Sequence, residues 1–386
     1  MYLSETSQPF LLPPRAYFAA DVAEREESRL LRPAWHPIGL SDHLARPGQF
    51  VTATVLGVPV VVRRFGEDET SVAAFRNVCS HRHCTIVGDA RGTSAKLRCP
   101  YHGWEYGHDG LTRRIPKAKN FPHFDREAHR LDAFEVARCG GLWFVRLGEA
   151  ESLQPSETLR SFLGHWYDWI AERTSPPLWK PALETTLPAD ANWKIPIEGS
   201  LESYHLDDVH AKSFGADADP GEENTEHTIE TAFTSFATNH RPTTLMTRLE
   251  DAGLETLGIA NPSGRYEQHH LFPNLMLAHL PSMTLVTSVM PTSPTRCELR
   301  LWQWGPQPRG SRTRTKLFGP LVARTMGQMA SRASVTVLKE DVAIFPSVQA
   351  GLAARNDVDL PRGIFGRCEE RLAAFHRYVD MVMVDD

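Results

Sequence analysis

The feature that most constrains this chain is a pair of short segments, each with one cysteine and one histidine close together. Cys79 and His81 are separated by one residue, Cys99 and His102 by two, and 17 residues lie between the two pairs. Two thiolates and two imidazoles make a four-ligand set, and thiolates suit iron–sulfur clusters and zinc. We therefore expect two loops that meet at one metal centre.

Two kinds of centre fit this ligand set. A Rieske-type [2Fe–2S] cluster binds one iron through two cysteines and the other through two histidines. A structural zinc site usually pairs cysteine with cysteine and histidine with histidine. Here each segment is mixed, and Pro100 and Gly103 indicate a tight turn in the second segment. The spacing favours the Rieske-type cluster, with zinc as the alternative.

A second candidate site combines two histidines, five residues apart, with an aspartate. On a regular α-helix His205 and His210 would diverge by about 140°, so a π-type turn or a helix end must separate them if they share an ion. Asp341 falls on the apolar stripe of a long helical pattern, where a carboxylate is costly unless it is paired or binds metal. Such a set is compatible with ordinary structural residues, or with the two-histidine, one-carboxylate triad of non-haem iron oxygenases.

Both sets resemble those of the aromatic-ring-hydroxylating oxygenase α subunits, the Rieske oxygenases, over roughly residues 35–382. The similarity lies in the run C-x-H-R with C-P-x-H-G-W, in N-W-K followed by E-x-Y-H-x4-H, and in E-D followed by V-Q-x-G-L. In this sequence those motifs supply Arg82, Trp104, Asn192, Trp193, Lys194, Glu202, Tyr204, Glu340, Val348, Gln349, Gly351 and Leu352 in addition to the candidate ligands.

The resemblance implies an α+β fold with two domains. An N-terminal antiparallel β Rieske domain would occupy residues 35–150, and a helix-grip (START-like) catalytic domain residues 151–386. A helical segment at 1–34 would pack on the catalytic domain. The implied cofactors are a Rieske [2Fe–2S] cluster and a mononuclear non-haem Fe(II). Their implied ligands are Cys79, His81, Cys99 and His102 for the cluster, and His205, His210 and Asp341 for the iron.

The resemblance also implies how electrons reach the iron. In the family, the acidic residue at the position of Glu202 bridges a Rieske histidine of one subunit and an iron-binding histidine of its neighbour. By resemblance, Glu202 would contact His102 across a subunit boundary of a homotrimer and orient His205. An external reductase, directly or through a ferredoxin, would supply the electrons, because the chain has no nucleotide-binding fingerprint.

The implied activity is monooxygenation or dioxygenation of a small organic substrate with O2, by hydroxylation or oxidative demethylation. Nothing in the sequence decides between these reactions or identifies the substrate. The alternative is a Rieske ferredoxin-like electron carrier, which needs only about 110 residues, the size of one small domain.

Three positions depart from the family pattern. His83 stands where the family often has glycine. Cys84 matches a disulfide cysteine of the cytochrome bc-type Rieske proteins, but Tyr101 stands at its partner's position, so that disulfide cannot form. Gly199 follows Glu198 where the family commonly has asparagine.

The amino-acid composition limits the kinds of partner and the location that we expect for this chain. The net charge of −5, from 42 basic and 47 acidic residues, gives no basic excess for binding nucleic acid or an anionic membrane. No apolar window long enough for a transmembrane helix is found, and the first residues do not read as a secretory signal. With six cysteines, too few for a disulfide scaffold, we expect a reducing, cytoplasmic location.

Periodicity predicts the main elements. Strands are expected at 51–55, 58–62 and 142–145 in the first domain, and at 228–238, 269–277, 284–290 and 298–304 in the second. Helices are expected at 16–31, from beyond Pro320 to about Phe345, and at 369–382.

Overall fold

The computed structural model describes residues 8–148, 158–215, 218–241, 245–259, 264–354, 363–367 and 369–383. The chain forms two compact units, one of Arg32–Glu172 and one of Met1–Leu31 with Arg173–Asp386. The N-terminal segment thus belongs to the same unit as the C-terminal half. Cys368 lies outside the described residues. No described helix combines the length and apolar composition that crossing a bilayer requires.

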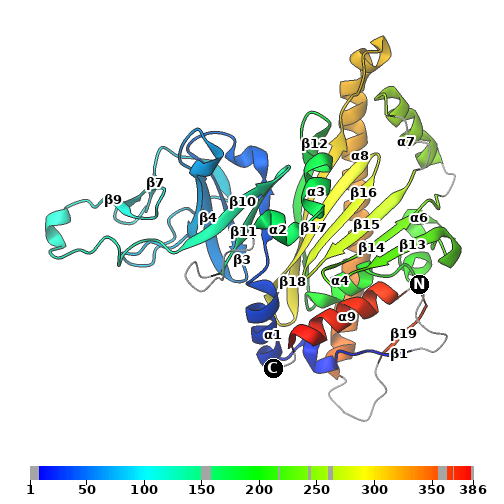
Figure 1. Cartoon of the computed structure of the whole chain (residues 1–386), viewed down its shortest axis with the longest axis horizontal. Helices are drawn as coiled ribbons and strands as arrows, with labels where there is room; N and C mark the ends of the chain where they lie inside the picture. The colour runs from blue at the N-terminus through cyan, green and yellow to red at the C-terminus, as the bar shows by residue number, and fades with distance from the viewer. Residues whose placement is uncertain are drawn as a thin grey trace. The chain divides into compact units, whose positions relative to one another are not determined.

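The unit Arg32–Glu172 contains two antiparallel sheets (Figure 1). The larger has seven strands in the order β2-β11-β10-β5-β4-β3-β6, and the smaller has the order β7-β8-β9. The strand bounds are β2 His36–Leu40, β3 Gln49–Val55, β4 Val58–Arg64, β5 Val72–Arg76, β6 Arg91–Thr93, β7 Leu97–Arg98, β8 Glu105–Tyr106, β9 Thr112–Arg114, β10 Ala133–Cys139 and β11 Leu142–Arg146. The helices α2 Leu159–Leu163 and α3 Trp166–Thr174 follow.

The strands predicted in this unit are confirmed as β3, β4 and β11. Between β3 and β4, Val55 pairs with Val58, so the turn contains only two residues. Both have positive φ, +48° at Leu56 and +73° at Gly57. Two left-handed residues form the type I′ turn, whose twist matches that of the strands it joins.

The other unit is built on a second seven-stranded antiparallel sheet, in the order β12-β18-β17-β16-β15-β14-β13. Its strands are β12 Trp179–Ala189, β13 Thr225–Ile229, β14 Phe233–Thr238, β15 Tyr266–Leu271, β16 Leu275–Leu280, β17 Met283–Ser293 and β18 Arg296–Pro306. β12 and β13 are consecutive in sequence but form opposite edges of the sheet. The segment between them must therefore cross the sheet, and it carries both histidines of the second candidate site.

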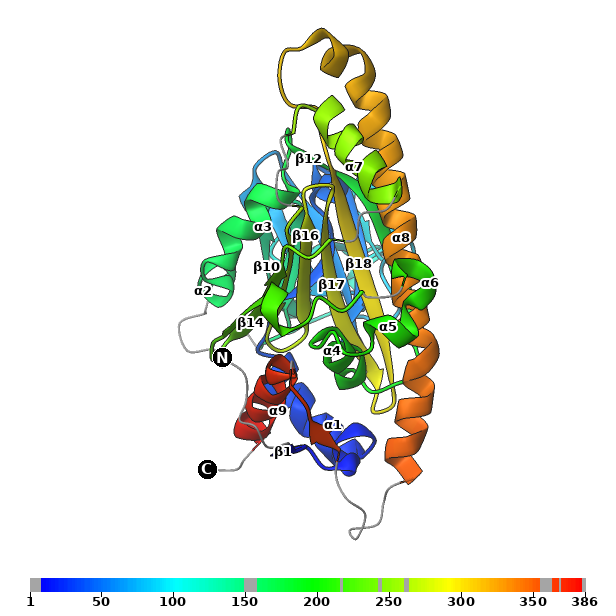
Figure 2. The same ribbon diagram turned by 90° about the vertical axis from the view of Figure 1, so that its right-hand side faces the viewer.

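The helices of this unit are α1 Ala20–Glu26, α4 Lys194–Ser200, α5 Leu206–Val209, α6 Ala211–Phe214, α7 Leu245–Thr256, α8 Thr313–Ala354 and α9 Glu370–Met383. A short sheet pairs β1 Gln8–Pro9 with β19 Ile364–Phe365. Helix α8 runs along the sheet and packs on β12 and β18 (Figure 2). Glycines allow this close approach, because a Cβ at Gly305 of β18 would lie 3.3 Å from Cα of Gly327 in α8.

Several predicted elements differ from the structure. The strand expected at 228–238 is a hairpin of β13 and β14, and the one expected at 269–277 is divided between β15 and β16 by the turn at Pro273. Helix α8 begins at Thr313, before Pro320, and continues past Pro346. A proline normally ends a helix or weakens it, but tertiary contacts stabilise this one: α8 packs on β12 and β18, and beyond Pro346 the Gln349 side chain accepts from the N–H of Asn192 and donates to the carbonyl of Tyr17. The helix expected at 16–31 consists of a 3₁₀ turn, α1 and a π turn.

A buried polar network connects the N-terminal segment to α4. Lys194 Nζ lies 2.7 Å from Oε1 of Glu26 and donates to the carbonyl oxygen of Ala16 at 2.8 Å, while Trp193 Nε1 donates to Glu26 at 2.8 Å. Burial lowers the pKa of Lys194, although the charge of Glu26 acts in the opposite direction. A buried ion pair left without one partner is strongly destabilising, so this network fixes α4, and the histidine segment after it, against the N-terminal segment.

Candidate functional site

The two cysteine–histidine segments fold as loops with the same hydrogen-bond pattern. In the first, the N–H of Cys79 donates to the carbonyl of Cys84 and the N–H of His83 donates to that of Cys79. In the second, the N–H of Cys99 donates to the carbonyl of Trp104 and the N–H of Gly103 donates to the carbonyl of Cys99. His83 and Gly103 occupy equivalent positions, and both have positive φ, +55° and +71°. The turn therefore requires a residue in the left-handed conformation. This explains why the family often has glycine where this chain has His83.

The loops bring the four predicted cluster residues together. The rings of His81 and His102 are 4.6 Å apart, and each cysteine is only 1% exposed. Burial raises the pKa of Cys79, and the neighbouring Cys99 adds to this rise. Nδ1 of His81 is buried without a hydrogen-bond partner, whereas His102 is exposed. A buried, unpaired ring nitrogen beside two buried thiols fits a metal cluster, because an unsatisfied polar atom is otherwise costly.

Aromatic residues contact both loops. Trp104 stacks on His81, with ring centroids 4.7 Å apart and 5° between the planes. The hydroxyl of Tyr106 lies 3.0 Å from Sγ of Cys79 and 3.1 Å from Oγ of Ser80. Hydrogen bonds to a cluster sulfur change its reduction potential. Sequence reasoning missed Tyr106, although its place in R-C-P-Y-H-G-W-E-Y, four residues after His102, could have indicated it.

Cys84 is a free cysteine with its Sγ 3.4 Å from the carbonyl of Thr85. Tyr101 stands at the position of the second disulfide cysteine. Its side chain is exposed, and the ring of Tyr101 lies 5.7 Å from the guanidinium of Arg82.

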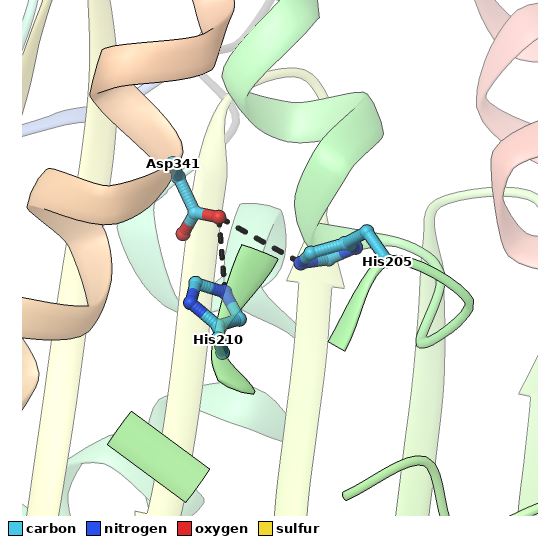
Figure 3. A group of neighbouring side chains, drawn as sticks. All are labelled: His205, His210 and Asp341. Atoms are coloured by element: carbon cyan, nitrogen blue, oxygen red, sulfur yellow. Dashed lines mark ion pairs between the residues drawn. The ribbon is translucent and has the colours of Figure 1, made fainter. Parts of the chain in front are cut away.

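The second set of predicted residues also converges (Figure 3). One ligand atom from each of His205, His210 and Asp341 can be chosen so that all three lie within 4.8 Å of one another. Oδ1 of Asp341 is 3.0 Å from Nε2 of His210 and 3.7 Å from Nε2 of His205. The two imidazoles therefore present Nε2 to a single carboxylate, so the three side chains could share one ion.

A separate carboxylate contacts the other nitrogen of each imidazole. Nδ1 of His205 lies 2.5 Å from Oε1 of Glu202, and Nδ1 of His210 lies 2.8 Å from Oε2 of Glu340. A carboxylate can only accept, so each Nδ1 carries the proton and each Nε2 has a free lone pair. This pairing of a metal-binding histidine with a carboxylate is common in metal sites. Sequence reasoning identified Glu202 but assigned no contact to Glu340.

A helix end separates the two histidines, one of the two possibilities predicted from their spacing. His205 is the N-cap of α5 and His210 its C-cap, and α5 has only four residues. Glu202 lies outside any helix, between α4 and α5, so the prediction that it shares a helical face with His205 is wrong. Its contact arises because the turn folds the carboxylate back onto both the backbone N–H and the ring of His205.

The electrostatics of the site suit a cation. Burial raises the pKa of Asp341 to about 6, against the opposing effects of His210 and His205. Burial acts to lower the pKa of His205, but the hydrogen bond and charge of Glu202 outweigh it and raise that pKa. With Glu202 and Glu340 included, three carboxylates surround two imidazoles. A divalent cation at this point would compensate the excess negative charge and the burial of Asp341.

Comparisons with known proteins match a known domain to part of each of the two units. A family model for the ring hydroxylating alpha subunit (catalytic domain) matches residues 177–385, and one for the Rieske [2Fe-2S] domain matches residues 34–125. The glycine betaine monooxygenase oxygenase subunit of Chromohalobacter salexigens is 33% identical over 204 residues, 53% of this chain and 42% of that protein. The chloroplastic choline monooxygenase of Spinacia oleracea is 31% identical over 204 residues, 51% of this chain and 45% of that protein. Each match spans less than half of the relative.

Solved structures show the same fold. A quaternary ammonium Rieske monooxygenase, described with carnitine oxidation by gut microbiota, superposes with a TM-score of 0.74 at 19% identity, covering 97% of this chain and 95% of that one. Naphthalene 1,2-dioxygenase with indole bound gives 0.69 at 18% identity, covering 97% and 92%. The predicted α+β fold, with a Rieske domain and a catalytic domain, is confirmed.

The matched domains imply the two cofactors predicted from sequence, a Rieske [2Fe–2S] cluster and a mononuclear non-haem iron. Because the catalytic-domain model covers more than half of its residues, this chain belongs to the family of ring hydroxylating alpha subunits with a Rieske domain.

Proposed function

We propose that this chain is the oxygenase component of a Rieske non-haem iron monooxygenase that oxidises a small quaternary ammonium compound, by hydroxylation or oxidative demethylation. The observation that carries the proposal is the convergence of His205, His210 and Asp341, with a carboxylate on Nδ1 of each histidine. An electron carrier has no use for this second set. The zinc alternative for the first set is also disfavoured, because the matched domain is of the Rieske type.

In this proposal the chain's own residues hold and orient the iron. His205, His210 and Asp341 bind it from one side, which leaves positions open on the other side. Glu202 and Glu340 keep the proton of each neutral imidazole on Nδ1, so that Nε2 carries the lone pair that binds a metal. When bound, the ferrous ion would supply the activation of O2, and the protein supplies the arrangement of its three ligands.

The substrate class rests on the relatives. Two named relatives, at 33% and 31% identity, are monooxygenases of glycine betaine and choline. The naphthalene dioxygenase match, at 18% identity, supports only the fold, so an aromatic substrate is less well supported.

We further propose that electrons come from a separate reductase, directly or through a ferredoxin, and that the chain acts as a homotrimer. In such a trimer Glu202 would connect His205 to His102 of a neighbouring subunit. The family resemblance supports this arrangement, and so do two local features. Glu202 already binds His205, and the side chain of His102 is exposed and thus accessible to another chain.

The proposed function is tested with purified protein, a Rieske-type reductase, NADH and O2. Glycine betaine, choline and carnitine are offered separately, and both O2 consumption and formaldehyde release are measured. We expect substrate-dependent O2 consumption with at least one of them, and formaldehyde if the reaction is a demethylation. If none increases O2 uptake while naphthalene or indole does, the substrate class is wrong.

The iron site is tested with Asp341→Ala. We expect this variant to lose mononuclear iron and all turnover, but to keep the visible absorption of the cluster, whose ligands lie in the other unit. Wild-type activity or wild-type iron content in the variant would contradict the assigned ligands.

A further inference from the structure

The turn that carries Glu202 and His205 has little regular secondary structure of its own. It lies between α4 and α5, and α5 has only four residues. The two ends of the surrounding segment are fixed, Lys194 of α4 by a buried ion pair and His210 by Glu340. The turn between these anchors needs contacts of its own, because a metal site requires ligands that packing and hydrogen bonds keep in place.

A hydrogen bond connects this turn to a segment further along the chain. Oγ of Ser203 donates to Oδ1 of Asp219 at 2.8 Å. Ser203 is only 8% exposed, and its carbonyl accepts from the N–H of Leu206 at 3.1 Å, which closes a turn with His205 in its centre. The residue that binds Asp219 therefore follows Glu202 in the sequence and begins the turn around a candidate iron ligand.

Asp207, in α5, forms a second connection in the opposite direction. Its Oδ1 accepts from the N–H groups of Ala218 at 2.6 Å and of Asp219 at 3.2 Å. Oδ1 of Asp219 also accepts from the N–H of Gly221 at 3.3 Å, which fixes this carboxylate within its own segment. Asp207 thus binds the backbone of the segment, and Asp219 binds Ser203. We call the bonds of Ser203 and Asp207 to this segment the Asp219 clamp.

The bonds of the clamp are of a strong kind. Each has an ionised carboxylate as its acceptor, and such charge-assisted bonds are roughly twice as strong as neutral ones. They order the turn before any ion binds. In their absence the ion itself would have to order the turn, and the free energy of that ordering would weaken its binding.

We propose that Asp219 is a positioning residue of the candidate iron site and acts on His205 through Ser203. This inference rests on the proposed function and deepens it, because it names a further residue of the same site. Asp219 is not one of the three candidate ligands. The clamp keeps Nε2 of His205 directed at Asp341 and keeps the carboxylate of Glu202 on Nδ1 of the same ring.

The test uses the full-length protein without substrate or reductase. Mononuclear iron is removed with a chelator and Fe(II) is titrated back anaerobically. Nitric oxide is then added, and the EPR spectrum of its complex with the iron reports the symmetry of the site. The variants are Ser203→Ala, Asp219→Ala and the double variant, with Ser203→Thr and Asp219→Asn as conservative changes that keep a donor and an acceptor at these positions.

Two matched controls separate the clamp from other causes. Ser200→Ala removes a hydroxyl that donates to the carbonyl of Pro196, within α4. Asp208→Ala removes an exposed carboxylate of α5, and so one negative charge, but leaves the bonds of Ser203 and Asp207 in place.

We expect Ser203→Ala and Asp219→Ala each to weaken Fe(II) binding by about three- to tenfold, as expected when a hydrogen bond that orients a ligand is lost. Both should change the EPR spectrum in the same way. The double variant should bind Fe(II) no more weakly than the weaker single variant, because both changes remove one interaction. Ser203→Thr and Asp219→Asn should keep most of the wild-type affinity, and the two controls all of it.

Wild-type affinity and a wild-type spectrum in both alanine variants would overturn the proposal. Additive losses in the double variant would also overturn it, because the two side chains would then act independently. An equal loss in Asp208→Ala would show an effect of net charge instead of position, with the same consequence.

Hydrogen exchange on iron-free wild-type protein needs no variant, so it decides the question if the alanine variants do not fold. The N–H groups of Ala218 and Asp219, which Asp207 accepts, should exchange slowly before iron is added. Rapid exchange there would mean that no clamp orders the turn in advance. The proposed function fails separately, when wild-type protein binds no Fe(II) or oxidises no quaternary ammonium compound.

Discussion

At the scale of single residues, the two histidines of the candidate iron site have the same arrangement of partners. Nε2 of each points to Asp341, and Nδ1 of each meets its own carboxylate, Glu202 or Glu340. Oε1 of Glu340 also accepts from Oγ of Ser213, so this carboxylate is fixed from two sides. Each imidazole thus has its proton and its orientation set before any ion binds.

This arrangement predicts the effect of Glu340→Gln. The amide oxygen still accepts from Nδ1 of His210 but carries no charge, so the imidazole becomes a weaker ligand. We expect the affinity for Fe(II) to fall by about tenfold, the lower end of the range for such outer partners, with the cluster unaffected. Fe(II) titration of chelator-treated protein measures it. The control is Glu24→Gln, an exposed glutamate of α1, and equal affinities of the two variants would contradict the role of Glu340.

The candidate ligands and the partner Glu202 could be named from sequence, but the partners Glu340 and Tyr106 could not. His205, His210 and Asp341 have residue types and spacings that few other functions require. Glu340 is 130 residues from His210, and Tyr106 is 27 residues from Cys79. Nothing local in the sequence specifies which distant glutamate or tyrosine reaches a given ligand. That choice depends on how α8 and the small sheet pack.

At the scale of elements, the approach of α8 to the sheet determines where Asp341 lies. A Cβ on Gly305 would lie 3.3 Å from Cα of Gly327, and a Cβ on Gly327 would lie 3.3 Å from Cβ of Ala182 in β12, so a side chain at either position would require its neighbours to shift. A substitution at this point must therefore move the helix or strain the sheet.

We expect Gly305→Val to lower the free energy of unfolding by about 1–3 kcal/mol, as overpacking does. Because α8 carries Asp341, the variant should also bind Fe(II) more weakly. Urea unfolding and Fe(II) titration measure the two effects. The control is Gly351→Ala in the same helix, where an added Cβ meets no atom within 4 Å. Unchanged stability in Gly305→Val would show that α8 does not depend on this contact.

A buried histidine in the sheet predicts how the free energy of unfolding depends on pH. His270 in β15 is fully buried, and its burial lowers the pKa to about 3. In the unfolded chain the same imidazole takes up a proton near its ordinary pKa of 6.5. The unfolded state therefore binds more protons between these values, and the free energy of unfolding decreases as the pH falls from about 6.5 to 3.

One such histidine changes the free energy of unfolding by up to about 1.4 kcal/mol per pH unit between these two pKa values. His270→Phe should reduce the pH slope of wild-type protein by that amount between pH 6 and pH 4, whatever its effect on stability at neutral pH. Urea unfolding at several pH values measures the slope. Parallel slopes for the two proteins would mean that His270 titrates alike in both states.

At the scale of the whole molecule, the candidate metal-binding residues are divided between two units. The cluster residues lie in Arg32–Glu172, and the triad lies in the unit that also contains the N-terminal segment. Electron transfer between the two kinds of centre must therefore follow either a path within one chain or one between subunits. The proposed homotrimer favours the second path.

Complementation between inactive variants distinguishes these paths. Cys99→Ser chains should lack the cluster and Asp341→Ala chains the iron, so neither is active alone. If electrons cross between subunits, co-assembly of the two variants should restore part of the activity, measured as substrate-dependent O2 consumption. Mixtures in which each variant is assembled only with itself are the control. Inactive mixed trimers, verified by affinity tags on both chains, would indicate transfer within one chain.

The sequence by itself determined the metal chemistry of this protein and its fold class. Thiolates and imidazoles at short spacings favour a small set of metals, and such spacings are visible without a structure. The tertiary structure alone decided the helix end between His205 and His210, the course of α8 through its prolines, and the contact of Glu340 with His210. Each of these depends on packing between segments far apart in the chain, and local residue preferences do not specify such packing.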